Sequence, residues 1–372
     1  MFKHYSDNEQ FNLQINRFIN DEYEDEQSVQ DDVAEIVGQL KDTETWYQAW
    51  LEKAQEREEK GDWEIASTYY QAAEFYLGLD DPRSKTIYDK YRETFYKGYH
   101  DFKYEQFKVP YEQSYLPVTK LINPGAKKDL LLFAGYDSYM EEMVKMSKYL
   151  KGIDYNIYVL DGPGQGTALR NGLKLIHNWE KPISTIIDYF EMKNVSVIGM
   201  SLGGYLVMRA AAFDKRITKI AAFDIFYSFM DALRLRLPYQ TMTKIEQMLK
   251  KNEREKLNAL FQKMMSVNLD LNWKINKGIE NTGVRDPFTL LKEFQKYNVK
   301  SILPFINQDV LLLVGGEDDQ YVPSTRLPEI EEGLINAGKV KTVIFTKETG
   351  GEQHCQAGHR ELGFNAIKEF LA

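Results

Sequence analysis

The feature that most constrains the fold of this chain is a serine flanked by glycines where a strand pattern gives way to a helix pattern. Residues 199–204 read Gly-Met-Ser-Leu-Gly-Gly, with the serine at position 201. An apolar run with β-branched residues precedes them, and a stretch of good helix formers follows. A sharp strand-to-helix turn leaves little room for side chains two residues before and after the serine, which Gly199 and Gly203 satisfy. The pattern predicts that Ser201 is a nucleophile, against the alternative of a glycine-rich turn without chemistry.

The chain beyond residue 105 alternates short apolar runs with helical patterns. This alternation predicts an α/β fold with a largely parallel sheet flanked by helices. The segment 108–122, with two prolines and short β-like runs, is expected to contribute leading strands. The predicted strands are 130–133, 155–160, 195–198, 217–223, 310–314 and 340–345, and the predicted helices are 140–150, 182–190 and 202–213.

Two other parts of the chain have a helical pattern. The first is 1–105, where small residues between Trp46 and Tyr76 predict two closely packed helices, and the acidic stretch 21–32 is expected to be solvated. We interpret this part as an accessory helical domain, against a peptide-binding repeat array, because only one repeat-like unit is visible. The second is 226–300, with an amphipathic run at 244–265, which we interpret as a lid inserted in a catalytic domain of 106–372. The alternative for it is a separate helical domain.

A serine nucleophile needs a base, and the chain has five histidines. In the α/β-hydrolase fold, where such strand–serine–helix turns occur, the order is serine, acid, histidine. This order leaves His354 and His359 as candidates. His354 lies in a loop directly after the last predicted strand, whereas His359 begins the final helical pattern and is expected to cap it. We therefore predict that His354 is the base.

The acid that orients the histidine is expected after the predicted strand 310–314, in a turn rich in carboxylates. Asp319 has the favoured spacing, three residues after a glycine and just before Val-Pro. Glu317 and Asp318 are expected to be exposed. Asp224, at the end of the predicted strand 217–223, is the alternative acid.

Backbone N–H groups are expected to form an oxyanion hole. One belongs to Leu202, directly after the nucleophile. The other is expected after the strand 130–133, where Tyr136 is the candidate by position, although an HGGG motif is missing.

Other classes of function lack support in the sequence. The Gly-rich stretch 161–166 does not have the dinucleotide spacing, and its proline removes an N–H that phosphate binding would use. Cys355 beside two histidines lacks further metal ligands, so we expect neither a metal nor a cofactor. The net charge of −9 argues against a nucleic-acid partner. We expect a cytoplasmic enzyme without membrane contact. The N-terminus is polar, an apolar run of about 18 residues is lacking, and there is a single cysteine.

Together these residues resemble one branch of the α/β-hydrolase superfamily. The branch includes acylaminoacyl-peptidase-like hydrolases, the pseudooxynicotine hydrolases, which cleave carbon–carbon bonds, and related esterases. The resemblance implies an N-terminal helical accessory domain, Ser201, Asp319 and His354 as the catalytic triad, and a homodimer. The matching segments are 135–138 with 141–142, 161–166, 199–204, 316–323 and 354–356.

The sequence thus predicts a serine hydrolase that cleaves a small ester or amide, for example an N-acyl amino acid or a short acyl-peptide. The first alternative is a carbon–carbon hydrolase with the same triad, which a second acid near the pocket, Asp224 or Glu141, would weakly favour. The second is a binding or regulatory protein without turnover, which would require Ser201 and His354 to lie too far apart to bond.

Overall fold

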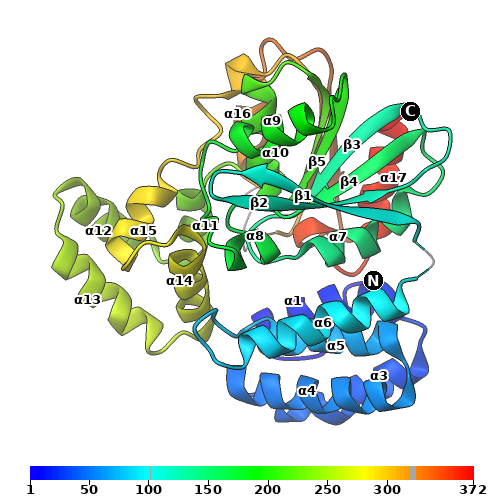
Figure 1. Cartoon of the computed structure of the whole chain (residues 1–372). Helices are drawn as coiled ribbons and strands as arrows, with labels where there is room; N and C mark the ends of the chain where they lie inside the picture. Colours follow the sequence, from blue (N-terminus) through cyan, green and yellow to red (C-terminus); the bar gives the residue numbers. More distant parts are fainter. Residues whose placement is uncertain (101, 319–323) are drawn as a thin grey trace.

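An eight-stranded sheet forms the centre of the computed structural model, which describes residues 1–100, 102–318 and 324–372 (Figure 1). The strand order is β1-β2-β4-β3-β5-β6-β7-β8. β1 and β2 form an antiparallel hairpin, β2 pairs antiparallel with β4, and the remaining neighbours are parallel. The bounds are β1 Tyr104–Tyr111, β2 Ser114–Leu121, β3 Lys128–Phe133, β4 Tyr155–Leu160, β5 Val195–Met200, β6 Ile217–Phe223, β7 Asp309–Gly315 and β8 Val340–Phe345. The predicted α/β-hydrolase fold is confirmed, and three predicted strands have the predicted bounds.

Helices cover both faces of the sheet, which explains why central strands such as β5 and β7 are buried along almost their whole length, whereas the outer strands β1 and β8 are partly exposed. Within β3, Leu131 and Phe133 belong to the core on one face, and Leu130 and Leu132 belong to the core on the other. The first core includes side chains of α9 (Glu180–Tyr189), α10 (Gly203–Phe213) and α16 (Leu327–Gly333). The second includes side chains of α7 (Met140–Met146) and α17 (Arg360–Leu371).

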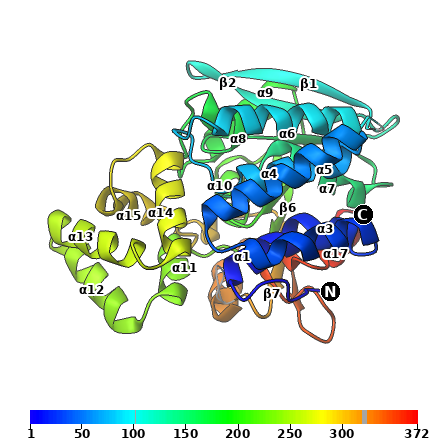
Figure 2. The same ribbon diagram turned by 90° about the horizontal axis from the view of Figure 1, so that it is seen from below.

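The N-terminal helices form a layer beneath the sheet, seen from below in Figure 2. Their core is aromatic: Trp46, Trp50 and Tyr69 are fully buried. The two helices predicted between Trp46 and Tyr76 are present as α4 and α5, joined at a left-handed Gly61. The bounds are α1 Glu9–Ile15, a π-helical turn η1 Asn16–Asn20, α2 Asp21–Tyr23, α3 Gln27–Ile36, α4 Thr43–Lys60, α5 Trp63–Glu74 and α6 Ser84–Gly98.

The prediction that the acidic stretch 21–32 is solvated is wrong at its two ends. The Asp21 side chain is 2% exposed and pairs with Arg360. The Asp32 carboxylate accepts hydrogen bonds from Arg57 and Tyr69. Cations from other elements neutralise these carboxylates, which allows their burial.

Five helices are inserted between β6 and β7, at the left of Figure 1. The predicted single amphipathic run at 244–265 is two helices, interrupted where Asn252 adopts a positive φ of 54°. These helices share a small apolar core of their own, and Trp273 packs on Phe75 and Tyr76 of the N-terminal layer with ring centroids 4.8 and 5.4 Å apart. The bounds are α11 Phe229–Arg236, α12 Tyr239–Lys250, α13 Arg254–Met265, α14 Leu269–Thr282 and α15 Pro287–Phe294.

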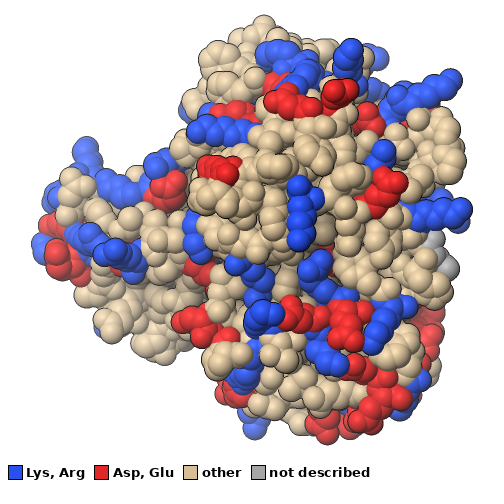
Figure 3. All heavy atoms as spheres, viewed as in Figure 1, with Lys and Arg blue, Asp and Glu red and all other residues tan. Residues whose placement is uncertain are grey.

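Charged side chains of both signs are interspersed on the face shown in Figure 3, with acidic ones gathered over the N-terminal helices at the bottom. Among the helices described, none combines the length and the apolar character that crossing a membrane requires.

Gly98→Ala tests the close packing of α5 and α6. A Cβ at Gly98 would lie 2.8 Å from the Glu64 backbone nitrogen, so the helices must shift. We expect the free energy of unfolding to fall by about 1–3 kcal/mol. Gly38→Ala is the matched control, because a Cβ there meets nothing within 4 Å. Urea denaturation of both variants measures the difference, and equal effects would contradict this account of the interface.

Candidate active site

Ser201 lies on a strained turn between β5 and α10. Its φ of +61° is in the left-handed region, which non-glycine residues rarely adopt. Its N–H donates to the Phe223 carbonyl at 2.7 Å, and its own carbonyl accepts from Gly204 at 2.8 Å. These bonds hold the turn against the end of β6 and so fix the position of the serine.

The glycines around Ser201 differ in how strictly they are required. A Cβ at Gly199 would lie 2.2 Å from the Gly203 carbonyl oxygen, so no side chain fits there. A Cβ at Gly203 would lie 3.2 Å from its nearest neighbour, the Ala134 carbonyl oxygen, whereas one at Gly204 would lie 2.2 Å from the Asp224 carbonyl oxygen. A glycine is therefore required more strictly at position 204 than at position 203. The sequence analysis did not single out Gly204.

His354 joins the serine to a carboxylate. Its Nε2 lies 2.9 Å from Ser201 Oγ, and its Nδ1 bonds Asp318 Oδ2. His354 stands in a short 3-10 turn after β8, as expected, whereas His359 is exposed at the start of α17 and its side chain makes no capping bond. Burial alone would lower the pKa of His354, but the negative charge of Asp318 and the further interactions with Asp318 and Cys355 together raise this pKa well above its ordinary value.

The carboxylate on His354 differs from the expected one. Asp319 lies outside the described residues, and the position beside Nδ1 is taken by Asp318. The expectation that Asp318 is exposed is wrong, since its side chain is 1% exposed. The Asp318 N–H donates to the Gly315 carbonyl at 3.2 Å, so the chain turns back immediately after β7 and directs this residue inward.

The loop that carries one expected oxyanion donor, Tyr136, passes close to the other, Leu202. A Cβ at Gly135 would lie 2.7 Å from the Leu202 nitrogen, so the loop after β3 runs directly over the elbow. Within the described part of the chain, neither the Tyr136 N–H nor the Leu202 N–H has an acceptor. Both are thus free to bind an oxyanion.

Gln165 orients this loop, a role that the sequence analysis missed. Its Nε2 donates to the Ala134 and Gly135 carbonyls at 2.7 and 2.8 Å. In a trans peptide the C=O and N–H point in opposite directions, so fixing the Gly135 carbonyl also fixes the Tyr136 N–H. The available signal was its position in the Gly-rich stretch 161–166, which is also one of the segments that match the α/β-hydrolase branch.

Comparison with known proteins gives the family. No family model matches the chain. Hydrolase LUC6 of Fusarium sp is 30% identical over 348 residues, which cover 82% of this chain and 81% of that protein. This chain belongs to the α/β-hydrolase superfamily, in the family of LUC6. The 20-hydroxy-prefusarin hydrolase FUS2 of Gibberella moniliformis is 29% identical over 347 residues, covering 81% of each chain.

Solved structures share the fold of this hydrolase. The 2,6-dihydroxy-pseudo-oxynicotine hydrolase superposes with a TM-score of 0.63 at 18% identity, covering 88% of this chain and 87% of that one. AbyA5 superposes with a TM-score of 0.69 at 15% identity, covering 98% and 95%. A role in hydrolysis follows from the relatives; the acylaminoacyl-peptidase-like branch stays a prediction.

A cavity of about 450 Å³ in this hydrolase contains Ser201, His354 and the oxyanion loop in its wall. Part of its wall comes from the inserted helices, where the apolar Phe229, Leu233, Ile275 and Phe294 are joined by the charged Arg236, Asp270 and Lys274. Another part comes from the N-terminal segment, which contributes the polar Gln10, Gln14 and Arg17. The cavity is therefore amphipathic and closed by parts of the chain far apart in sequence.

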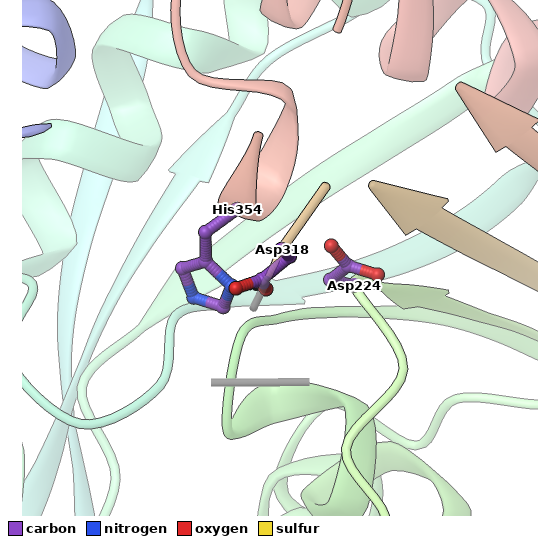
Figure 4. Close-up of side chains that lie close together, drawn as sticks. All are labelled: Asp224, Asp318 and His354. Atoms are coloured by element: carbon purple, nitrogen blue, oxygen red, sulfur yellow. Dashed lines mark hydrogen bonds and ion pairs between the residues drawn. The ribbon is translucent and has the colours of Figure 1, made fainter. Parts of the chain in front are cut away.

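Asp224, the alternative acid, lies on the side of Asp318 that is away from His354 (Figure 4). It is fully buried, and its Oδ2 accepts from the Gly315 and Cys355 N–H groups at 3.2 and 3.4 Å. Its ligand atoms and those of Asp318 and His354 lie within 4.8 Å of one another. These atoms already bond one another or backbone amides, so a metal would displace existing bonds. Burial, and then the charge of Asp318, raises the pKa of Asp224 to about 7.

Asp224→Asn tests this buried proton. The folded wild type keeps the proton up to about pH 7, whereas the unfolded chain releases it near its usual pKa, so wild-type stability falls as pH rises between these values. The variant lacks this group. The wild type should therefore lose about 1–4 kcal/mol relative to Asp224→Asn between pH 4 and pH 7.

Urea unfolding of both proteins across this pH range gives the measurement. Asp25→Asn, at an exposed position, is the control, and its difference from wild type should stay constant with pH. A constant difference for Asp224→Asn as well would contradict a protonated Asp224.

Proposed function

We propose that this chain is a serine hydrolase that cleaves a small ester or amide through an acyl-enzyme on Ser201. The observation that carries the proposal is the 2.9 Å contact between Ser201 Oγ and His354 Nε2, with Asp318 bonded to the other ring nitrogen. A serine hydroxyl becomes a useful nucleophile only when a base in hydrogen-bond contact accepts its proton. The proposed triad is Ser201, Asp318 and His354.

In the proposed mechanism, Ser201 Oγ attacks the substrate carbonyl while its proton passes to His354 Nε2. Asp318 holds the imidazole with Nδ1–H toward itself and stabilises the imidazolium. The Tyr136 and Leu202 N–H groups donate to the oxyanion. His354 then gives its proton to the leaving alcohol or amine. Water, deprotonated by the same histidine, attacks the acyl-enzyme and releases the acid.

The cavity supports a small amphipathic substrate. The apolar side chains of the inserted helices fit an acyl chain or ring, and the polar and charged side chains in the wall fit a hydrogen-bonding head group. An N-acyl amino acid or short acyl-peptide meets both demands. The inserted helices form one wall of the cavity, so we propose that they are its lid, over residues of about 226–300. From the sequence we also propose an accessory domain at 1–105, a catalytic domain at 106–372, a homodimer and a cytoplasmic location.

The alternative of carbon–carbon bond cleavage gains no support from the two acids suggested for it. Asp224 is fully buried behind Asp318, and Glu141 is buried against Arg92 and Tyr96; neither contributes to the cavity wall. Product analysis separates the reactions, because an ester or amide yields an alcohol or amine. The alternative without turnover requires separation of Ser201 from His354, and their 2.9 Å contact counts against it.

A fluorophosphonate probe tests the activated serine. The wild type should be labelled, Ser201→Ala should not be labelled because the nucleophile is missing, and His354→Ala should be labelled at least about 100-fold more slowly because the base is missing. Gel fluorescence after timed exposure measures the rates. Equal labelling of wild type and Ser201→Ala, both folded, would disprove the proposal.

A second comparison tests which acid serves the histidine. Asp318→Asn should lower turnover of 4-nitrophenyl acetate by about 10⁴-fold, because an amide favours the wrong imidazole tautomer. Asp319→Asn is the matched neighbour and should change turnover less than about 3-fold, because Asp318 is the carboxylate bonded to His354 Nδ1. Steady-state kinetics of the two variants measures the difference. A large loss in Asp319→Asn with little change in Asp318→Asn would indicate that Asp319 is the acid instead.

A further inference from the structure

The N-terminal segment reaches the catalytic site through Arg17, on the π-helical turn η1. The Arg17 side chain is 12% exposed and contributes to the cavity wall. Its Nη1 donates to Asp137 Oδ1 at 2.9 Å, and its Nη2 lies 3.3 Å from the Asp137 carbonyl oxygen. Asp137 directly follows Tyr136, whose N–H is a proposed oxyanion donor. Arg17 therefore binds the oxyanion loop at the residue next to Tyr136, whose N–H is the proposed donor.

The same guanidinium also binds the start of α7. Nε and Nη2 of Arg17 donate to the two oxygens of Glu142 at 2.9 and 2.8 Å, a bidentate pair that only arginine can make. Ser138 and Gln71 also donate to Glu142 Oε2, so the carboxylate is fixed from three sides. Burial alone would raise the pKa of Glu142, but Arg17 and the other donors lower it to about 2, so it is ionised when it binds Arg17.

The other side of η1 contacts the segment that follows His354. The Arg17 carbonyl accepts from Arg360 Nη1 at 3.2 Å, and Asp21 accepts from the Arg360 N–H at 3.3 Å. The Asp21 and Arg360 side chains form a buried ion pair, with exposures of 2% and 5%. The first residues of the chain add to this contact, because a Cβ at Gly358 would lie 2.7 Å from the Phe2 backbone. The segment 354–360 is thus fixed to the same turn that holds the oxyanion loop.

We propose that η1 is a clamp that holds the oxyanion loop and the histidine loop in register, with Arg17 as a positioning residue for the Tyr136 N–H. The proposal rests on the proposed function. It makes the N-terminal helices part of the catalytic apparatus. Arg17 touches no reacting atom in this role. Its loss would leave Asp137 and Glu142 without their shared counter-ion, and the loop would move away from the elbow.

A purely structural role for Arg17 predicts a different result. Its guanidinium also lies over the rings of Phe18 and Phe75, at 5.0 and 5.3 Å, so its removal will cost stability in any case. A structural role would lower the fraction folded and leave the kcat of the folded enzyme unchanged. The clamp predicts a lower kcat in the folded enzyme, because a misplaced oxyanion donor costs about 10²–10³-fold.

The experiment measures kcat and KM of Arg17→Ala for 4-nitrophenyl acetate, per folded molecule. We expect kcat to fall about 100-fold with KM changed less than about 3-fold, because the lost contact acts in the transition state. Guanidinium chloride at a millimolar, non-denaturing concentration should restore part of kcat, since it can occupy the vacated site beside the cavity. Arg17→Lys should stay well below wild type, because an ammonium cannot form the fork.

Arg57→Ala is the matched control. Arg57 is a buried arginine of the same helical layer, 8% exposed and paired with Asp32 at 2.6 Å, but it contacts neither catalytic loop. It should lower stability without changing kcat or responding to guanidinium. If Arg17→Ala does not fold, Asp137→Ala removes the same contact from the loop side and should lower kcat at least about 10-fold.

Two results would overturn the clamp: an Arg17→Ala kcat within about 3-fold of wild type, or an equal loss and an equal guanidinium response in Arg57→Ala. Failure of the proposed function gives a different result, because Ser201→Ala would then keep the wild-type activity.

Discussion

Ser201 can act only if its backbone stays in the left-handed conformation, and the surrounding structure is built to keep it there. The parallel strands β5 and β6 end at the same edge, so Phe223 can accept from the Ser201 N–H at 2.7 Å. Gly199 and Gly204 leave the space that the neighbouring backbone needs. Strain at one residue persists when its surroundings over-determine it, and here the sheet, the helix and the crossing loop all do so.

Charge is the second constraint on the site. His354 bonds the buried Asp318, and the buried Asp224 lies close to both, so two carboxylates stand near one imidazole. Two negative charges at this distance are costly, and the raised pKa of Asp224 keeps a proton there. Asp318 can then serve as the single charged partner of His354, while Asp224 holds the backbone of the two loops that carry this pair.

Three distant parts of the chain close the cavity, and each has a separate task. The loop after β3 supplies the proposed oxyanion donor, the inserted helices supply most of the aromatic side chains, and the N-terminal segment supplies polar side chains that include Arg17. The fold at the sheet is common to hydrolases that differ in chemistry, so the substrate depends on these additions. Trp273 of the inserted helix α14 packs into the core of the N-terminal layer, so these two parts of the chain stabilise each other's position.

The sequence by itself determined the strands, the elbow and the position of His354, because these depend on local patterns: apolar runs, glycine sterics and the order of elements along the chain. Only the tertiary structure placed Asp318 beside His354, since the chain turns back at Gly315 and directs Asp318 inward. It also brought Gln165 and Arg17 to their hydrogen-bond partners, which lie far away in sequence. The burial of Asp21 could not be predicted from the acidic stretch 21–32 for the same reason, because its partner Arg360 is 339 residues away in the sequence.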